Sequence, residues 1–182
     1  MGDIGQHRDV LLVLAAFSRY DAALDWARDR AVARWGPVEL ESPRFDFSYT
    51  SFYEKEMGDG LKKTFFAFRR LIDPTAIVDI KHRTNDWESQ FAAEHSFPEQ
   101  RPLNLDPGYL TEAKLVLATT KDRDHRLFLG SGIYAEVTLH FHHKAWRIRD
   151  WTYPDYQQPE YHEFLTRCRT YLRTCYRNPH DG

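Results

Sequence analysis

The sequence predicts an α+β protein with one mostly antiparallel sheet and about three helices packed mainly on one face. The first observation is the order of elements: a strand, a helix and two strands precede a second helix, three strands and a last helix. The second is that the late strands are joined by connections of hairpin length, too short for the crossover helices of a doubly wound parallel sheet. An elaborated ferredoxin-like core is one arrangement with this order.

The totals favour a single domain over residues 1–182. Aromatic residues make up 15% of the chain, so we expect a core packed largely by rings. The net charge of −2 gives no general attraction to nucleic acid or anionic lipid, and any anion-binding surface must therefore be local. The apolar run VLLVLAAF is too short to span a bilayer and lacks a signal-peptide cleavage site, so we expect a cytoplasmic protein without membrane contact.

Strands and helices alternate in the first part of the chain. Residues 10–17 are a short, mostly branched apolar run, which predicts a buried strand. From Tyr20 to Trp35 the apolar residues share one side of a helix, which Gly36-Pro37 ends. Residues 38–49 are interrupted by Pro43 but alternate Phe45, Phe47 and Tyr49 with polar neighbours, which suits an edge strand.

A third strand and a second helix follow a glycine-containing loop at residues 51–63. Residues 64–72 predict the strand, and Asp73-Pro74 is a typical helix start, with aspartate as the N-cap. We expect this helix to run to about Ala93, with a break near residues 84–85. Lys81, Asn85 and Glu88 would share one side of it.

The second half begins with residues 95–111, whose three prolines and one glycine predict a long irregular loop. Strands are expected at 114–120, 126–143 and 146–151, and an amphipathic helix at 160–176. Cys168 and Cys175 would lie about 10 Å apart along this helix, beyond disulfide reach, and we expect free thiols.

The connection KDRDHR, residues 121–126, is the main candidate for a site. Ammonium and guanidinium groups bind phosphate or carboxylate by charge-assisted hydrogen bonds, so we predict an anion held by Lys114, Lys121 and Arg126. His125 is the candidate acid or base because imidazole titrates near neutral pH, with Asp122 close enough to orient it. The alternative is a solvated hairpin turn with self-neutralising charges.

Other polar residues extend this candidate site. Glu136 would lie on the polar side of a strand in which Ile133, Ala135, Val137, Leu139 and Phe141 face the core and Tyr134, Glu136, Thr138, His140 and His142 face the other way. The remaining candidate ligand-binding residues are Asn104, Asp106, Tyr153 and Asp155. The alternative is an ordinary solvated sheet face. Glu136, His140 and His142 are also a weak candidate set for a divalent metal.

A family resemblance rests on several stretches of the chain. NLDPGYLT, KLVLATTKDRDHR, GIYAEVTLHF and WTYPDY together resemble the bacterial family catalogued as domain of unknown function 4416, and FYEKEMG, LIDP and IKHRTND are similar to it as well. The resemblance covers almost the whole chain. It implies a stand-alone bacterial protein of about this length and names neither an activity nor a cofactor.

Known reaction signatures do not match. No GxxxxGK[ST] stretch exists, so the chain has no P-loop, and Gly58-Asp59-Gly60 is only a glycine turn beside two lysines. His82-Arg83-Thr84 has the form of a phosphoesterase HxT motif but lies in a predicted helix instead of a strand. The sequence therefore leaves open whether the protein is an enzyme and which cofactor it would use.

Two hypotheses of different classes remain, beside a purely structural role. The first is an enzyme or binding domain for a small anionic ligand, phosphate-bearing or nucleotide-like, at the residues around 121–126. The second is a non-catalytic module that binds RNA or a protein partner through the polar sheet face, with Tyr134 and Tyr153 as stacking residues. A deep pocket would favour the first, and an open aromatic sheet face the second.

Overall fold

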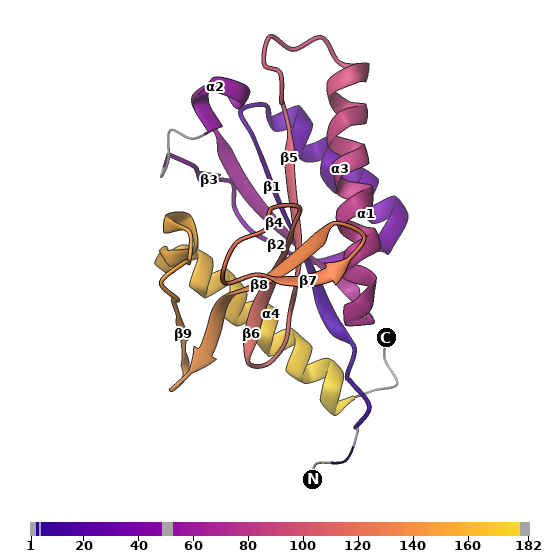
Figure 1. The fold of residues 1–182 in the computed structure, drawn as a ribbon, viewed down its shortest axis with the longest axis vertical. Helices are drawn as coiled ribbons and strands as arrows, with labels where there is room; N and C mark the ends of the chain where they lie inside the picture. The colour runs from indigo at the N-terminus through magenta and orange to yellow at the C-terminus, as the bar shows by residue number, and fades with distance from the viewer. Residues whose placement is uncertain (1–2, 4, 49–52, 179–182) are drawn as a thin grey trace.

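The computed structural model describes residue 3 and residues 5–48 and 53–178. Its strands are β1 (Val10–Ser18), β2 (Val38–Glu41), β3 (Phe45–Asp46), β4 (Lys62–Ile72), β5 (Asn104–Leu110), β6 (Lys114–Thr119), β7 (Leu127–Gly130), β8 (Ile133–His142) and β9 (Ala145–Arg147). Its helices are α1 (Asp21–Trp35), α2 (Glu54–Met57), α3 (Ile77–Glu94) and α4 (Pro159–Arg177). Within these residues the strands form one nine-stranded antiparallel sheet (Figure 1).

Both faces of the sheet are covered, and β1 is apolar from Val10 to Phe17 for that reason. Leu12, Leu14 and Ala16 belong to the core cluster that includes residues of α1 and α3. Leu11, Val13 and Ala15 belong to the cluster that includes residues of α4. Since successive side chains of a strand point to opposite faces, α1 and α3 cover one face and α4 covers the other. The predicted α+β class, with most long helices on one face, is confirmed.

The strand order is β2-β4-β1-β5-β6-β8-β7, with β3 paired to β4 and β9 paired to β8. In its first half, α1 connects β1 to β2 and α3 connects β4 to β5, on the same face of the sheet. A ferredoxin-like core also connects its strands through helices in this way. The assignment of a ferredoxin-like core stays a prediction. The later strands β6 to β9 extend the sheet beyond β5 (Figure 1).

The expectation of an irregular loop over residues 95–111 is wrong at its end, where β5 forms a central strand. The whole of β5 pairs with β1, from Asn104 opposite Phe17 to Leu110 opposite Leu11. With β6 it pairs only from Gly108 onward. Pro107, just before, has no N–H to donate to a neighbouring strand, so it is compatible with a position where pairing on that side has stopped.

Residues 126–143 form two strands, although one was predicted. The chain turns back at Gly130, Ser131 and Gly132, whose φ values are 117°, 51° and 77°. The returning strand β8 lies between β6 and β7. Residues 120–126 therefore connect β6 to β7, which is not its neighbour in the sheet, and they are not a hairpin turn.

The predicted alternation along β8 is also interrupted. The pairing of β6 with β8 shifts between Leu115 and Val116, so that Leu115 faces Leu139 and Val116 faces Val137. One extra residue in a strand reverses the side to which the following residues point. Ile133 accordingly packs in the α1 and α3 cluster, whereas Leu139 packs in the α4 cluster.

Smaller differences concern element ends. Helix α3 is continuous through residues 84–85, and the predicted loop at 51–63 contains α2. The edge strand expected at 38–49 is divided into β2 and β3, and its last expected residue, Tyr49, lies outside the described residues. Cys168 and Cys175 are free, as predicted. None of the described helices is long and apolar enough to cross a membrane.

Candidate functional site

A cavity of about 500 Å³ lies beside the point where β5 and β6 part. It takes residues from both faces of the sheet, since Lys81 and Asn85 come from α3 and Asp155 and Tyr156 come from the turn before α4. The charged lining residues are six cations (Lys63, Lys81, Arg101, Lys121, Arg123 and Arg126) and three carboxylates (Asp106, Glu136 and Asp155). The aromatic lining residues are Phe17, Phe47, Tyr53, Tyr153 and Tyr156.

The free edge of β5 is covered by two side chains of α3. Lys81 donates from Nζ to the carbonyl oxygen of Leu105 at 3.0 Å. The backbone N–H of Leu105 donates to Oε1 of Glu88 at 2.6 Å. Buried backbone groups need such partners, and here the helix supplies what β6 does not. The strands can therefore separate without leaving these groups unsatisfied, and the predicted common side of Lys81, Asn85 and Glu88 is confirmed.

The pairing of β5 with β6 begins at Gly108, where the two strands approach closely. A Cβ atom built on Gly108 would lie 2.3 Å from the carbonyl oxygen of Val116 and 2.7 Å from Cδ2 of Leu117. Both distances are far below van der Waals contact, so only glycine fits between the strands. The close approach on one side of Pro107 and the open space on the other define the inner end of the cavity.

Arg126 and Glu136 form a buried ion pair in the wall of the cavity. The Nε of Arg126 donates to Oε2 of Glu136 at 2.8 Å, and the exposed fractions of the two side chains are 4% and 2%. The other guanidinium nitrogens donate to the carbonyl oxygen of Lys121 and to the hydroxyl of Tyr153, each at 2.8 Å. Arg126 thus ties the start of the 121–126 connection to the residues before α4.

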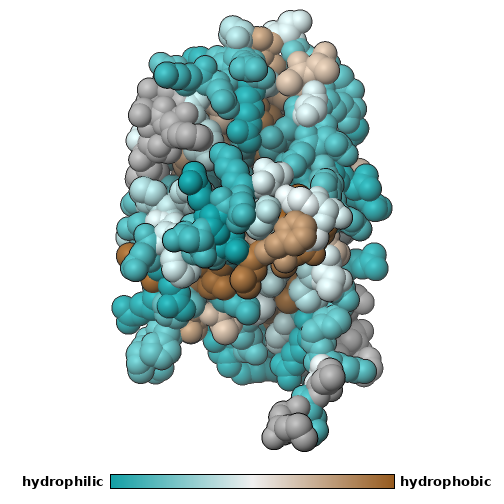
Figure 2. Space-filling model, viewed as in Figure 1, coloured by the Kyte–Doolittle hydropathy of each residue, from teal (hydrophilic) through white to brown (hydrophobic). Residues whose placement is uncertain are grey.

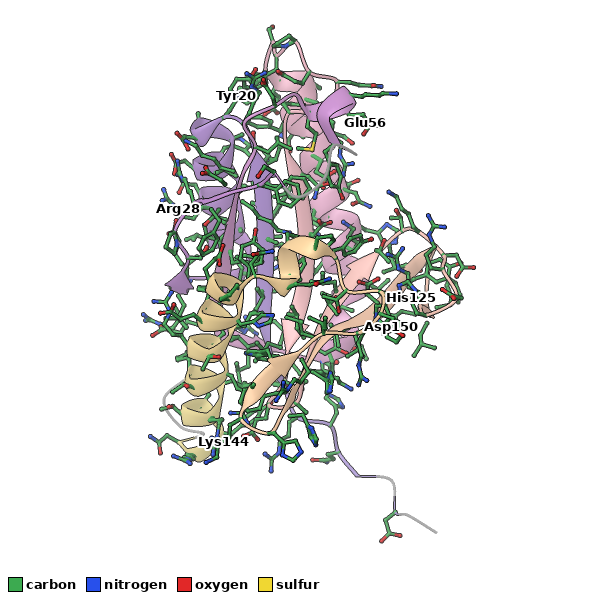
Figure 3. The ribbon with its side chains drawn as sticks, turned by 90° about the vertical axis from the view of Figure 1, so that its left-hand side faces the viewer. Tyr20, Arg28, Glu56, His125, Lys144 and Asp150 are labelled. Carbon is green, nitrogen blue, oxygen red and sulfur yellow. The ribbon has the colours of Figure 1, made fainter. Side chains whose placement is uncertain are left out.

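His125 contacts Glu136 of this pair but does not line the cavity. Its Nε2 is 3.1 Å from Oε2 of Glu136, and its ring stacks on Trp151 with the centroids 5.0 Å apart. The carboxylate beside its Nδ1 is Asp124, at 3.1 Å, whereas Asp122 was expected there. Asp122 is exposed and has no hydrogen bond to the imidazole in the described structure. Figure 3 shows His125 on the projecting loop, far from Lys144 at the tip of the β8–β9 hairpin.

Lys63 and Asp155 form a second buried pair. The Nζ of Lys63 donates to Oδ2 of Asp155 at 2.6 Å, and the exposed fractions of their side chains are 3% and 6%. The ammonium group is surrounded by aromatic rings, the nearest being Tyr156 with its centroid at 4.2 Å. Ring faces attract a cation, so these contacts add to the ion pair in stabilising the side chain of Lys63 at its buried position.

Asp106 stands in a third group of charges. Its Oδ2 accepts from Nδ2 of Asn104 at 2.9 Å, and its Oδ1 lies 3.4 Å from Nζ of Lys81. Burial alone would raise the pKa of this carboxyl, but the charges of Lys81, Lys63 and Arg101 outweigh burial and lower it. Asp106 is therefore an ionised carboxylate, and the three cations that act on it come from different parts of the chain.

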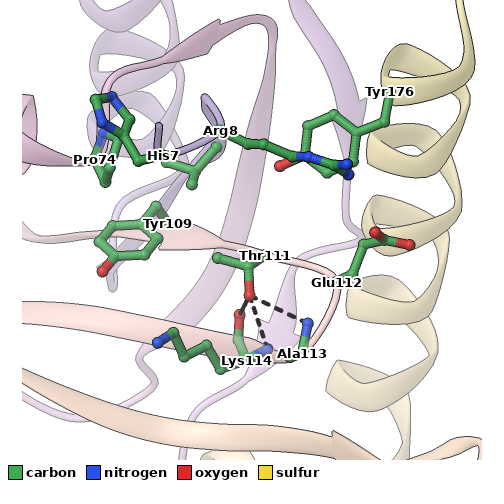
Figure 4. Close-up of a pocket in the computed structure, with 10 residues that line it drawn as sticks. His7, Arg8, Pro74, Tyr109, Thr111, Glu112, Ala113, Lys114 and Tyr176 are labelled. Carbon is green, nitrogen blue, oxygen red and sulfur yellow. Dashed lines mark hydrogen bonds between the residues drawn. The ribbon is translucent and has the colours of Figure 1, made fainter. Parts of the chain in front are cut away.

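Most of the predicted residues meet in this cavity. Those that line it are Asn104, Asp106, Lys121, Arg126, Glu136, Tyr153 and Asp155. Lys114 does not, because it lies at the other end of β6 and lines a separate shallow pocket of about 410 Å³ with Tyr109, Thr111 and Tyr176 (Figure 4).

The weak metal set is not brought together. Among the described residues, no three histidine, cysteine, aspartate or glutamate side chains are grouped so that they could hold a metal ion. The shift of register in β8 separates Glu136 from His140 and His142, because residues on its two sides no longer alternate in step.

Four residues line the cavity although no sequence motif predicted them as site residues: Lys63, Tyr53, Phe17 and Phe47. A usable signal existed for Lys63, a lysine at the start of the apolar run TFFAF in a strand with both faces buried. Lysine in such a position needs a partner, which here is Asp155.

A family model described as "Domain of unknown function (DUF4416)" matches residues 8–171. The match covers most of the chain and confirms the resemblance of the motifs. Comparisons with curated proteins and with solved structures find no match.

Proposed function

Because the chain belongs to the DUF4416 family, whose description names no activity, we propose a function from the cavity itself: it binds a small anionic ligand that carries a phosphate or a similar oxyanion. The observation that supports this most directly is the charge of the lining, in which six cations face three carboxylates. An excess of positive charge in a concave site attracts an anion and favours its binding.

The positions of the cations also support anion binding. Lys121 and Arg123 are exposed residues of the connection between β6 and β7, and both line the cavity. Arg126 is buried behind them and holds that connection against Tyr153 through its hydrogen bonds. The backbone that carries the exposed cations is thereby fixed. This lowers the entropic cost of ordering the two side chains when an anion binds.

An RNA- or protein-binding module is the second candidate. It is favoured by one observation: the edge strand β7 exposes Leu127, Phe128 and Leu129, and Figure 2 shows an apolar patch on the corresponding face. Phe128 also packs against Tyr134, with the ring centroids 5.2 Å apart. However, helices cover both faces of the sheet, and Tyr153 is bound to Arg126 beside the cavity. The small-molecule hypothesis therefore has the stronger support.

Thermal unfolding in the presence of anions tests the proposal. We expect phosphate or pyrophosphate to raise Tm by about 5–10 °C at a concentration 100 times Kd, relative to chloride at equal ionic strength. The variant Lys121→Gln/Arg123→Gln should lose most of this rise, because it removes exposed cations without touching the buried pairs. The matched control is Lys114→Gln, an exposed lysine at the other end of β6, which should keep the rise. Equal shifts with chloride, or an equal loss in the control, would contradict the proposal.

A further inference from the structure

The charged groups that the cavity presents to a ligand differ between its two sides. In the ion pair of Lys81 with Asp106, the lysine side chain is 6% exposed and the aspartate 31% exposed. The carboxylate is therefore the member of this pair that a ligand can reach. On the other side, the exposed charged groups are the cations Lys121 and Arg123.

The side around Asp106 is built to accept hydrogen bonds. An ionised carboxylate has about four positions for donors and donates none itself. Asp106 receives one hydrogen bond from Asn104 and one from Lys81, so acceptor capacity remains. The neighbouring Arg101 does not offset this, since its guanidinium group is already held by Asn104 and Glu88 and lies 3.8 Å from Glu56.

A ligand that carried only acceptor oxygens would leave the remaining acceptor positions of Asp106 without a donor. A bare oxyanion gains from Lys121 and Arg123 but cannot satisfy Asp106. Hydroxyl groups can, because each donates a proton to a carboxylate oxygen. Two neighbouring hydroxyls can occupy both oxygens, as acidic side chains do with the hydroxyls of ribose in dinucleotide-binding proteins.

We infer that the ligand is a phosphate ester whose organic part carries neighbouring hydroxyl groups, with the phosphate at Lys121 and Arg123 and the hydroxyls at Asp106. This inference rests on the proposed function and adds the class of ligand. Free sugar or polyol phosphates and ribonucleotides share this chemistry. Asn85 and Tyr53 line the same cavity and offer further hydrogen-bonding groups and a ring surface to the organic part.

Calorimetric titration of the intact protein with a matched pair of ligands tests the inference. Glycerol 3-phosphate and n-propyl phosphate have the same carbon chain and phosphate and differ only in two neighbouring hydroxyls. We expect glycerol 3-phosphate to bind at least about tenfold more tightly than n-propyl phosphate, because its hydroxyls donate hydrogen bonds to a charged acceptor and these bonds stabilise the complex. Tighter binding of ribose 5-phosphate than of adenosine 5′-monophosphate would support a free sugar phosphate as the source, and the reverse order would support a nucleotide.

The variant Asp106→Asn gives an independent readout. It should abolish most of the preference for glycerol 3-phosphate while leaving the affinity for inorganic phosphate unchanged or slightly higher, because one negative charge is removed. The control Asp122→Asn, an exposed aspartate that does not line the cavity, should keep the preference. If inorganic phosphate binds to the wild type but propyl phosphate binds as tightly as glycerol 3-phosphate, the inference is overturned and the proposed function stands. If no phosphate compound binds, both are overturned.

Discussion

Lys81 and Glu88 lie about two helical turns apart on α3 and bind the carbonyl oxygen and the N–H of the same residue, Leu105. Both backbone groups of Leu105 therefore point away from β1, toward the side on which β6 has already diverged. A helix replaces a strand as the hydrogen-bonding partner. This replacement explains how a central strand can border a cavity that is lined with charge.

The variant Lys81→Met should destabilise the protein by about 1–3 kcal/mol, because it leaves the carbonyl of Leu105 without its donor and Asp106 without its nearest cation. The free energy of unfolding in urea measures the effect. Arg83→Met is the matched control, since it removes an exposed cation from the same helix and should change the free energy by less than about 0.5 kcal/mol. Equal effects of the two substitutions would show that the contact with Leu105 is not important.

The pair of Arg126 and Glu136 should be strongly coupled. Glu136→Gln leaves a buried guanidinium without its counter-charge, and we expect a loss of about 3 kcal/mol in the free energy of unfolding. A double-mutant cycle with Arg126→Gln should give a coupling energy of about 1–3 kcal/mol. The same cycle on Arg69 and Glu39, whose side chains are 58% and 29% exposed, should give less than about 1 kcal/mol. Similar couplings in the two cycles would contradict the burial of the first pair.

Gly108→Ala should lower stability by about 1–3 kcal/mol or more, because the new methyl group would collide with the backbone of Val116. Relief of the collision would require β5 and β6 to move apart. Gly5→Ala is the control, since nothing lies within 4 Å of a Cβ atom at that position. Chemical denaturation of both variants measures the difference, and a neutral Gly108→Ala would mean that the two strands are not in close contact.

Stability should depend on acid pH through Asp106. Its pKa is lower in the folded protein than the ordinary value of 3.8, so the folded state binds fewer protons than the unfolded state near that pH. This contribution is fully present above the ordinary pKa and is lost as the pH falls through the lowered value. Asp106→Asn should therefore lose less stability than the wild type between about pH 5 and pH 2. Urea titrations at several pH values measure the slopes, with Asp122→Asn as the control.

Glu88 should contribute with the opposite sign. Burial raises the pKa of this carboxyl above its ordinary value of 4.5, although the charges of Lys81 and Arg101 oppose the shift. Stability then falls as the pH rises from the ordinary pKa through the raised one. Glu88→Gln should remove this fall, and an unchanged slope in the variant would contradict the shift.

The sequence predicted the elements whose side chains repeat regularly. The apolar run of β1 and the amphipathic pattern of α4 are visible without a partner, and the structure confirms both. The strand β5 could not be recognised, because Pro107 and Gly108 are local signals for a loop and the pairing with β1 that overrides them comes from distant residues. Local patterns therefore predicted β1 and α4, whose own side chains repeat regularly, and missed β5, whose strand conformation depends on its pairing with β1.

The candidate site was predicted in part for the same reason. Closeness in sequence to the 121–126 connection correctly predicted that Lys121 and Arg126 lie together. The same criterion was wrong for Lys114, which lines another pocket. A strand rises about 3.3 Å per residue, so the two ends of β6 are separated by roughly 17 Å. Lys63 shows the converse, because it lies far away in the sequence and reaches the cavity through the neighbouring strands.

The most direct test of the anion-binding cavity is a crystal structure of the protein grown with tungstate, an oxyanion of phosphate shape that is located by its anomalous scattering. We expect tungstate between β5 and β6, with its oxygens within about 3.2 Å of nitrogen atoms of Lys121 or Arg123. A cavity without tungstate in crystals that bind it elsewhere, for example in the shallow pocket at Lys114, would show that the cavity does not bind oxyanions.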